Sequence, residues 1–177
     1  MKARSLAVFA VVAGLSAAGG VLYQLGSRGG GAGYDPAEVV ERILAAPHAD
    51  VKGETRRVGD WRGRVLVVNY WATWCAPCRE EIPVFVQMQE RYGGRGLQFV
   101  GIAIDQPDKV AEFAREFRIN YPLLLGGVET IELVRQVGNQ AGVLPYTLVI
   151  DRTGKLVTRE RGGLKEDRLE SLIRPLL

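Results

Sequence analysis

Two cysteines, Cys75 and Cys78, limit the folds and functions open to this chain more than any other part of its sequence. They are the only cysteines among 177 residues, and the segment that contains them reads WATWCAPC. The preceding run, Val65–Tyr70, reads VLVVNY, and a short run of mostly β-branched apolar residues predicts a strand buried on both faces. Open α/β folds place their sites at the carboxyl ends of such strands. We therefore expect the pair at that edge of a sheet, with Cys75 at the start of the next helix.

The number and spacing of these cysteines argue against a metal site and against a structural crosslink. A structural zinc site needs four ligands, and the chain offers two cysteines and one histidine, His48. Covalent haem attachment needs a histidine directly after the second cysteine, where Arg79 stands. A disulfide between residues this close in sequence closes a very short loop, so it gains little stability.

A redox-active pair accounts for all of these features. Two intervening residues let the sulfurs meet across one helical turn. Backbone N–H groups and the helix dipole stabilise a thiolate at a helix N-terminus, so Cys75 is expected to be the exposed nucleophile. Cys78, one turn further on, is expected to be more buried and to resolve the mixed disulfide. Pro77 stands where a helix tolerates proline and stiffens the turn.

The rest of the sequence alternates helices with strands and ends in a hairpin and a helix. Helices are expected at 36–45, 79–92, 105–117, 130–137 and 165–177, and further strands at 97–104, 121–125, 146–150 and 155–159. Asp35 is expected to cap the first helix, and the polar residues 48–58 to form an irregular strand or hairpin. This order predicts an α/β fold with a mixed sheet and helices on both faces.

The N-terminal segment has the features of an export signal. Lys2 and Arg4 precede an apolar run at 6–25, and charges before such a run place the N-terminus in the cytoplasm. About 20 helical residues can cross a bilayer. We favour a single-pass anchor in residues 1–26, because the apolar run continues past the small residues that a signal peptidase requires. A cleaved signal peptide, which would leave a soluble periplasmic protein, is the alternative. The glycine-rich residues 27–34 are expected to form a flexible linker.

The charge distribution argues against nucleic-acid binding. The chain has 23 Lys and Arg against 20 Asp and Glu, a formal net charge of +3. Three of the basic residues lie in residues 1–33, which contain no acid, so the remaining 144 residues are balanced. No basic surface for nucleic acid is expected.

The segment VVNYWATWCAPC resembles the thioredoxin superfamily and, more narrowly, the exported TlpA/ResA-like thiol-disulfide oxidoreductases. The resemblance covers roughly residues 50–177. It implies that residues 35–177 form a thioredoxin-like domain with three α/β/α layers and a mixed central sheet. It also implies an additional strand–helix unit within 96–128, and the family fold here would follow the N-terminal membrane helix.

The resemblance extends to a second segment and implies which residues contact substrate. Residues 142–147 read GVLPYT and resemble the loop that faces the disulfide in this family. By that match Pro145 would be cis, and the backbone of Leu144 would pair with a substrate strand. Together with these two residues, we expect Trp74, Ala76 and Pro77 to form the substrate-binding surface.

Two further positions concern proton transfer. Cytoplasmic thioredoxins bury an aspartate six residues before the first cysteine, and Asn69 stands there, which cannot accept a proton. Glu81 follows Cys78 by three residues, so the two share a helix face. It matches an acidic position in the ResA-like group, which favours a role as proton acceptor for Cys78. The alternative is an acid that merely complements the helix dipole.

These features predict an exported protein-disulfide oxidoreductase on the periplasmic side of the bacterial inner membrane. Strong oxidants of the superfamily often have histidine between the cysteines, whereas Ala76 and Pro77 carry no charge, which favours a reductase. Expected partners are exported cysteine-containing proteins, and by resemblance apocytochrome c, together with a membrane thiol carrier that supplies electrons. We expect a monomer without a metal or any cofactor beyond the redox-active disulfide.

Two functions from other classes remain as alternatives. A thiol peroxidase of the peroxiredoxin type would need proline seven residues and threonine or serine three residues before its catalytic cysteine. Those positions are Val68 and Ala72. A metallochaperone could bind Cu(I) through the cysteine pair, since soft thiolates suit Cu(I), although no methionine cluster accompanies them.

Overall fold

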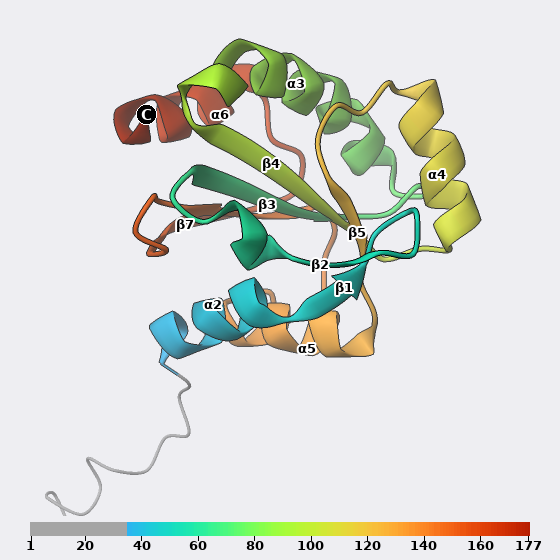
Figure 1. The fold of residues 1–177 in the computed structure, drawn as a ribbon, viewed down its shortest axis with the longest axis horizontal. Coiled ribbons are helices and arrows are strands. Elements are labelled where there is room, and N and C mark those ends of the chain that lie inside the picture. Colours follow the sequence, from blue (N-terminus) through green and yellow to red (C-terminus); the bar gives the residue numbers. More distant parts are fainter. Residues whose placement is uncertain (1–34) are drawn as a thin grey trace, which may run out of the picture. The chain divides into compact units, whose positions relative to one another are not determined.

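The structure is a computed structural model that describes residues 35–177, whose arrangement is shown in Figure 1. The expected anchor in residues 1–26 and the linker in residues 27–34 lie outside the described residues. Within residues 35–177, no helix has both the length and the apolar character that crossing a membrane requires.

A mixed sheet of five strands, in the order β5-β4-β3-β6-β7, forms the middle of the fold. Its strands are β3 (Val65–Trp71), β4 (Leu97–Ala103), β5 (Leu123–Leu125), β6 (Tyr146–Ile150) and β7 (Leu156–Arg161). β4 runs parallel to both β3 and β5, whereas β6 runs antiparallel to both β3 and β7. The mixed sheet expected from the sequence is therefore confirmed.

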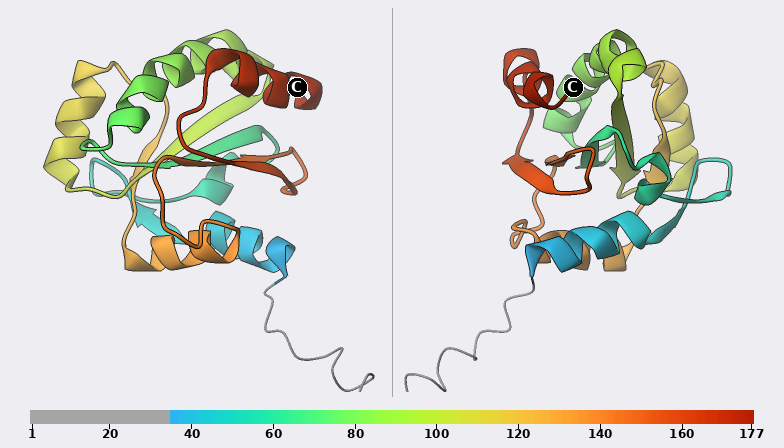
Figure 2. Two further views of the ribbon diagram at one scale, coloured as in Figure 1. Left: turned by 180° about the vertical axis from the view of Figure 1, so that it is seen from behind. Right: turned by 60° about the vertical axis from the view of Figure 1, so that its left-hand side comes forward.

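Five α-helices cover the two faces of this sheet. They are α2 (Pro36–Ala45), α3 (Ala76–Tyr92), α4 (Pro107–Glu116), α5 (Val128–Gln136) and α6 (Glu166–Ile173). Side chains of α3, α4 and α6 join the hydrophobic cluster on one face, and those of α2 and α5 join the cluster on the other. Figures 1 and 2 show the resulting layers, which confirm the α/β/α architecture.

Strand β3 runs through the centre of the sheet, and all seven of its residues are buried. Val67 and Trp71 belong to the cluster under α3, whereas Leu66 and Val68 belong to the opposite cluster. This alternation arises because successive side chains of a strand point to opposite faces. Since both faces are covered, the strand is an apolar run, and Asn69 is its one strongly polar residue.

Several observed bounds differ from the expected ones, and the largest differences are in α3 and α6. Helix α3 begins at Ala76, directly after Cys75, as the expected place of Cys75 at a helix start predicts, whereas the apolar spacing indicated a helix only from residue 79. Helix α6 ends at Ile173, and a 3₁₀ turn follows, because Pro175 has no N–H to continue the helix. Residues 96–128, where the additional unit was expected, contain β4, α4 and β5, and β5 is only three residues long.

The polar segment before the sheet forms the expected hairpin. Its strands, β1 (Pro47–Ala49) and β2 (Thr55–Arg57), pair antiparallel. Nδ1 of His48 lies 3.1 Å from the carbonyl oxygen of Leu125. The only histidine of the chain therefore links the hairpin to the edge strand β5 and lies outside the cysteine motif.

Candidate active site

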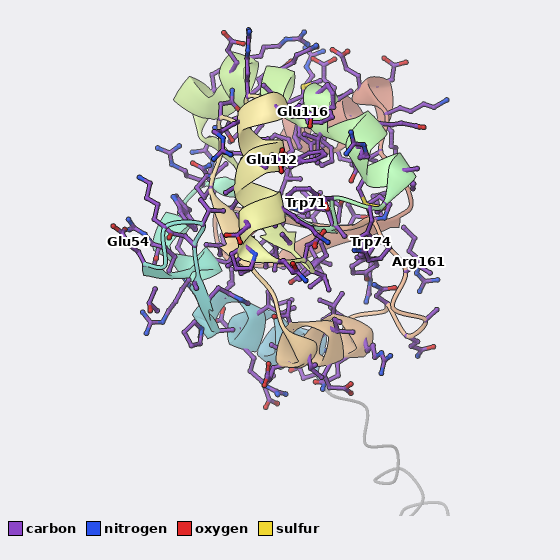
Figure 3. All side chains as sticks on the ribbon, turned by 90° about the vertical axis from the view of Figure 1, so that its right-hand side faces the viewer. Glu54, Trp71, Trp74, Glu112, Glu116 and Arg161 are labelled. Carbon is purple, nitrogen blue, oxygen red and sulfur yellow. A yellow bond between two sulfur atoms is a disulfide. The ribbon has the colours of Figure 1, made fainter. Side chains whose placement is uncertain are left out.

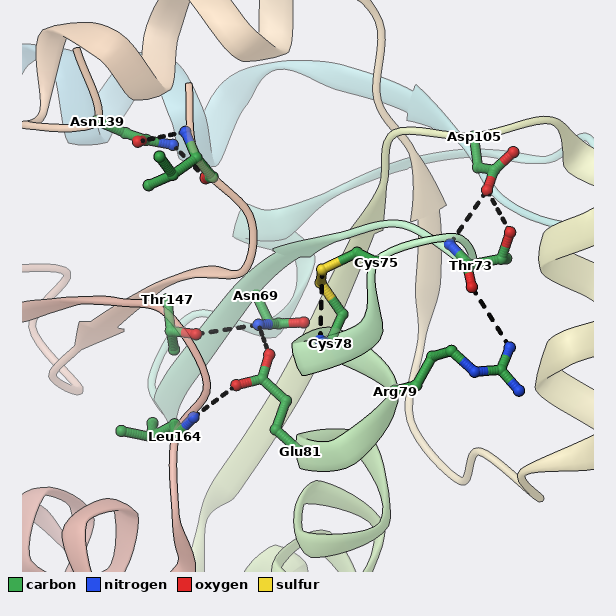
Figure 4. The surroundings of a disulfide bond; sticks show 11 residues. Asn69, Thr73, Cys75, Cys78, Arg79, Glu81, Asp105, Asn139, Thr147 and Leu164 are labelled. Atoms are coloured by element: carbon green, nitrogen blue, oxygen red, sulfur yellow. Dashed lines mark hydrogen bonds between the residues drawn. A yellow bond between two sulfur atoms is a disulfide. The ribbon is translucent and has the colours of Figure 1, made fainter. Parts of the chain in front are cut away.

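Cys75 and Cys78 form a disulfide at the start of α3, just beyond the end of β3 (Figure 4). Their Cα atoms are 5.3 Å apart. Cys75 caps the helix, and its Sγ accepts a hydrogen bond from the backbone N–H of Cys78, with an N–S distance of 3.3 Å. The pair thus lies where the sequence places it, at the carboxyl end of a buried strand and the N-terminus of a helix.

The exposure of the two cysteines follows the expected order but not the expected degree. Cys78 is fully buried, and Cys75 is only 6% exposed. Cys75 is therefore not the openly exposed nucleophile that the sequence suggested. The disulfide ties its sulfur to the buried Cys78, and the half-buried Leu144 packs against the same cluster.

Three exposed residues surround the disulfide on its outer side. Trp74, which is labelled in Figure 3, is 69% exposed. Ala76 and Pro77 are exposed as well. Trp71, by contrast, is buried, and its ring lies 5.1 Å from that of Phe113. The exposed apolar surface beside the disulfide therefore comes from Trp74 and the two residues between the cysteines.

The loop before β6 carries a cis peptide bond between Leu144 and Pro145, as the family resemblance implies. Its shape is held by Asn139, a buried residue that the sequence analysis did not single out. Nδ2 of Asn139 donates to the carbonyl of Val143, and Oδ1 accepts from the N–H of Val143, at 2.9 and 3.0 Å. The amide of Asn139 thus fixes the backbone directly before Leu144.

A pocket of about 210 Å³ lies between this loop and the cysteine segment. Trp74 and Leu144 both line it, together with Tyr70, Ile104 and Ile131. The structure therefore brings together two residues that the sequence predicts to contact substrate, although they are 70 positions apart in the chain.

Glu81 is a buried carboxylic acid one helical turn after Cys78. It is 3% exposed, and its two oxygens accept hydrogen bonds from Nδ2 of Asn69 and the backbone N–H of Leu164, each at 2.8 Å. Burial raises the pKa of Glu81 to about 7, although both hydrogen bonds oppose the shift. The carboxyl group therefore exchanges a proton close to neutral pH, as a proton acceptor for a thiol requires.

Asn69 connects Glu81 to the strand that follows the cis-proline loop. Its Nδ2 also donates to Oγ1 of Thr147 at 3.0 Å, because Asn69 and Thr147 are directly paired between β3 and β6. Neither the contact of Thr147 nor that of Leu164 was predicted from the sequence. These residues are 78 and 83 positions away from their partners, so no local pattern indicates the contacts.

The loop between β3 and Cys75 is anchored to Asp105, which lies two residues beyond the end of β4. Oδ2 of Asp105 accepts from both the backbone N–H and the hydroxyl of Thr73. Burial raises the pKa of Asp105, but hydrogen bonds from Thr73 and the N–H of Gln106 outweigh it, so this pKa lies below its usual value. A charged carboxylate thus holds the segment that carries Trp74.

Arg79 holds the same loop from the side of α3. Its Nη1 donates to the carbonyl oxygen of Thr73 at 3.3 Å. Its guanidinium lies 4.9 Å and 5.1 Å from the ring centres of Phe113 and Phe117. Arg79 is therefore occupied by contacts within the protein and is not the free surface arginine that an exposed helix position would suggest.

Comparison with known proteins agrees with this geometry. The model of the AhpC/TSA family matches residues 41–159. The thiol-disulfide oxidoreductase ResA of Geobacillus thermodenitrificans is 33% identical over 131 residues, which cover 70% of this chain and 72% of ResA. The thiol:disulfide interchange protein HelX of Rhodobacter capsulatus is 35% identical over 116 residues, which cover 65% of this chain and 62% of HelX.

A solved structure shows the same fold. The crystal structure of a thiol:disulfide interchange protein of the thioredoxin family from Chlorobium tepidum aligns with a TM-score of 0.67 and 29% sequence identity. The alignment covers 74% of this chain and 92% of that protein. The chain belongs to the AhpC/TSA family, and within the thioredoxin superfamily it is a TlpA/ResA-like thiol-disulfide oxidoreductase.

Proposed function

We propose that this oxidoreductase works as a reductase of disulfides in other exported proteins. The observation that carries the proposal is the environment of Cys75. Its sulfur accepts a hydrogen bond from one backbone N–H, and the intervening Ala76 and Pro77 carry no charge. A strong oxidant needs a specially stabilised reduced form. Among the hydrogen bonds of residues 35–177, none joins the sulfur of Cys75 to a histidine or a cationic side chain that would supply such stabilisation.

The exchange begins from the reduced protein. The thiolate of Cys75, stabilised by the start of α3, attacks one sulfur of a client disulfide. A mixed disulfide forms, and the first client thiolate leaves. Cys78 then attacks Cys75, the mixed disulfide breaks, and the client leaves with two thiols. Two electrons pass to the client, and the protein ends with the Cys75–Cys78 disulfide.

Glu81 serves the second half of this exchange. Cys78 is fully buried, which disfavours its thiolate, so its proton needs an acceptor. Glu81 lies one turn along the same helix, and its pKa of about 7 suits the transfer. The proton of Cys78 passes to the Glu81 carboxylate as Cys78 attacks, and it later leaves to solvent.

A reductase in an oxidising compartment must itself be recharged. We propose that residues 1–26 anchor the protein in the inner membrane and that the domain faces the periplasm. A membrane thiol carrier would then supply electrons to the Cys75–Cys78 disulfide. The N-terminal charges of Lys2 and Arg4 and the apolar run support this placement.

The client that we propose is apocytochrome c or another exported protein that awaits haem or a metal. The resemblance to TlpA/ResA-like proteins supports this choice. Haem attachment uses the sequence C-x-x-C-H, whose two cysteines must be reduced before haem can bind.

A defined peptide tests both the reaction and the client. The reduced protein is mixed with an oxidised C-x-x-C-H peptide and with an oxidised peptide of the same composition and scrambled flanking residues. We expect faster reduction of the first peptide, and the variant Cys78→Ser should accumulate a mixed disulfide through Cys75. Equal rates would contradict the proposed client, and no reduction of either peptide would contradict the proposed direction.

The same preparation separates the two alternative functions. A peroxiredoxin-type peroxidase would consume hydrogen peroxide with a thiol donor, and we expect no such turnover. A Cu(I) metallochaperone would hold copper in a one-to-one ratio on the reduced protein. Stoichiometric copper without disulfide exchange would overturn the proposal.

A further inference from the structure

Asn69 lies directly beneath the active-site turn. It stands on β3 between Val67 and Trp71, which belong to the same hydrophobic cluster as Cys78. Successive residues of a strand alternate between faces, so the side chain of Asn69 points to the face that α3 covers. Its contact with Glu81 places it beside the turn that runs from Cys78 to Glu81.

The hydrogen bonds of Asn69 fix the orientation of its amide. Nδ2 donates to Oε1 of Glu81 at 2.8 Å and to Oγ1 of Thr147 at 3.0 Å, so both of its N–H groups are used. A flipped amide would place its oxygen against a carboxylate oxygen, which has no hydrogen to donate when ionised. With Glu81 ionised, the oxygen of Asn69 therefore faces the other way.

That oxygen has no hydrogen-bond partner. Asn69 is 1% exposed, and its Oδ1 is the one buried side-chain N or O atom without a partner in the part of the chain that the structure describes. Figure 4 shows this oxygen pointing toward the disulfide. A buried carbonyl without a donor is unfavourable, so such an atom calls for an explanation.

The redox state of the cysteines supplies an explanation for this unpaired oxygen. Neither sulfur of the disulfide carries a hydrogen. When a dithiol donor reduces the pair, the S–S bond breaks and two electrons and two protons enter. One proton remains on Sγ of the fully buried Cys78. That thiol is a hydrogen-bond donor that the oxidised protein lacks.

We propose that Oδ1 of Asn69 accepts a hydrogen bond from the Cys78 thiol in the reduced protein, and that Asn69 thereby favours the dithiol over the disulfide. This inference rests on the exchange at Cys75 and Cys78 but not on its direction in the cell. Asn69 is a positioning residue here, since it contacts the resolving cysteine and not the client.

Infrared spectroscopy of a single thiol tests the contact. The variant Cys75→Ser leaves Cys78 as the only thiol of the full chain. An S–H that donates a hydrogen bond absorbs at lower frequency than a free S–H. We expect the band to be lowered in this protein and to rise when Asn69→Leu is added. In the control, Thr147→Val, the oxygen of Asn69 remains, so the band should stay lowered.

The frequency in the Cys75→Ser protein decides the matter even if Asn69→Leu does not fold. A band at the frequency of an alkanethiol in hexane would overturn the inference without a second variant. A band that stays lowered in folded Asn69→Leu would overturn it as well, because another group would then be the acceptor.

The redox equilibrium gives an independent readout. In otherwise unaltered protein, Asn69→Leu should shift the equilibrium with glutathione toward the disulfide by roughly twofold to tenfold, the range of one hydrogen bond. For a two-electron couple this makes the potential about 10 to 30 mV more negative. A shift toward the dithiol, or no shift, would contradict the inference. Because a potential is measured at equilibrium, this outcome is separate from whether the protein reduces its client.

Discussion

Glu81 is a nearly fully buried carboxyl group, and its burial raises its pKa to about 7. It lies one turn from Cys78, and both of its oxygens accept hydrogen bonds from fixed donors. Its neighbour Glu80 is exposed on the same helix. Glu80 and Glu81 are therefore matched for comparison: they are adjacent, they carry the same side chain, and they differ in burial.

Removing the acid at position 81 should slow the resolving step. Glu81→Gln is expected to lower the rate of client disulfide reduction at pH 7.5 by roughly 10²-fold, the lower end of what a positioned acid–base group contributes. The pH–rate profile should also lose its step near 7, which stopped-flow Trp fluorescence can follow. Glu80→Gln is the control and should keep both the rate and the step. Equal behaviour of the two variants would show that Glu81 does not transfer the proton.

The same carboxyl group makes stability depend on pH in a predictable direction. The pKa of Glu81 is raised from 4.5 to about 7 on folding, so between these values the folded protein binds more protons than the unfolded chain. Its contribution to stability is full below pH 4.5 and is lost as the pH rises toward 7. The loss is on the order of 3 kcal/mol.

Urea unfolding of the oxidised protein across this range measures the effect. Glu81→Gln should remove this part of the slope, whereas Glu80→Gln should retain it. The predicted sign would be wrong if, between pH 5 and pH 7, the free energy of unfolding of Glu80→Gln rose relative to that of Glu81→Gln.

At the scale of elements, the segment between β3 and α3 is held from two sides. Asp105, just beyond the end of β4, accepts two hydrogen bonds from Thr73, and Arg79 of α3 donates to the carbonyl of Thr73. The three polar groups of Thr73 are thus all bound within the protein. This segment carries Trp74, so its anchoring sets where the exposed indole stands beside the disulfide.

Loss of the Asp105 carboxylate should loosen this segment. Asp105→Ala leaves the N–H and hydroxyl of Thr73 without their acceptor, and we expect the free energy of unfolding to fall by about 1 to 3 kcal/mol. The control is Asp108→Ala, an exposed aspartate in the first turn of α4, whose effect should be within about 0.5 kcal/mol. Denaturant titration measures both, and similar losses in the two variants would contradict the role of Asp105.

The elements around the site were predictable from the sequence to different degrees. The apolar run at 65–70 and the cysteine spacing identify β3 and the start of α3, because both patterns are local. The contacts of Glu81 with Leu164 and of Asn69 with Thr147 form because β6 and the chain after β7 pack beside β3 and α3. The hydrogen bonds between Thr73 and Asp105 depend likewise on β4 ending beside β3. Such contacts follow from the pairing register, which a single sequence does not display.

At the scale of the whole molecule, the topology concentrates chemistry at one end of β3. The parallel strand β4 brings Asp105 to this end, and the antiparallel strand β6 brings the cis-proline loop before it and Thr147 at its second position. The chain after β7 adds the N–H of Leu164. A central strand with neighbours of both orientations can therefore collect residues from four parts of the chain around one disulfide.

The reduction potential of the Cys75–Cys78 pair tests the proposed reductase most directly. It is measured by equilibrating the protein with a series of glutathione buffers and following tryptophan fluorescence, to which Trp74 next to Cys75 contributes. We expect a potential well below roughly −200 mV, toward the thioredoxin end of the range. A potential near about −120 mV, that of strong periplasmic oxidants, would contradict the account and show that the protein forms disulfides.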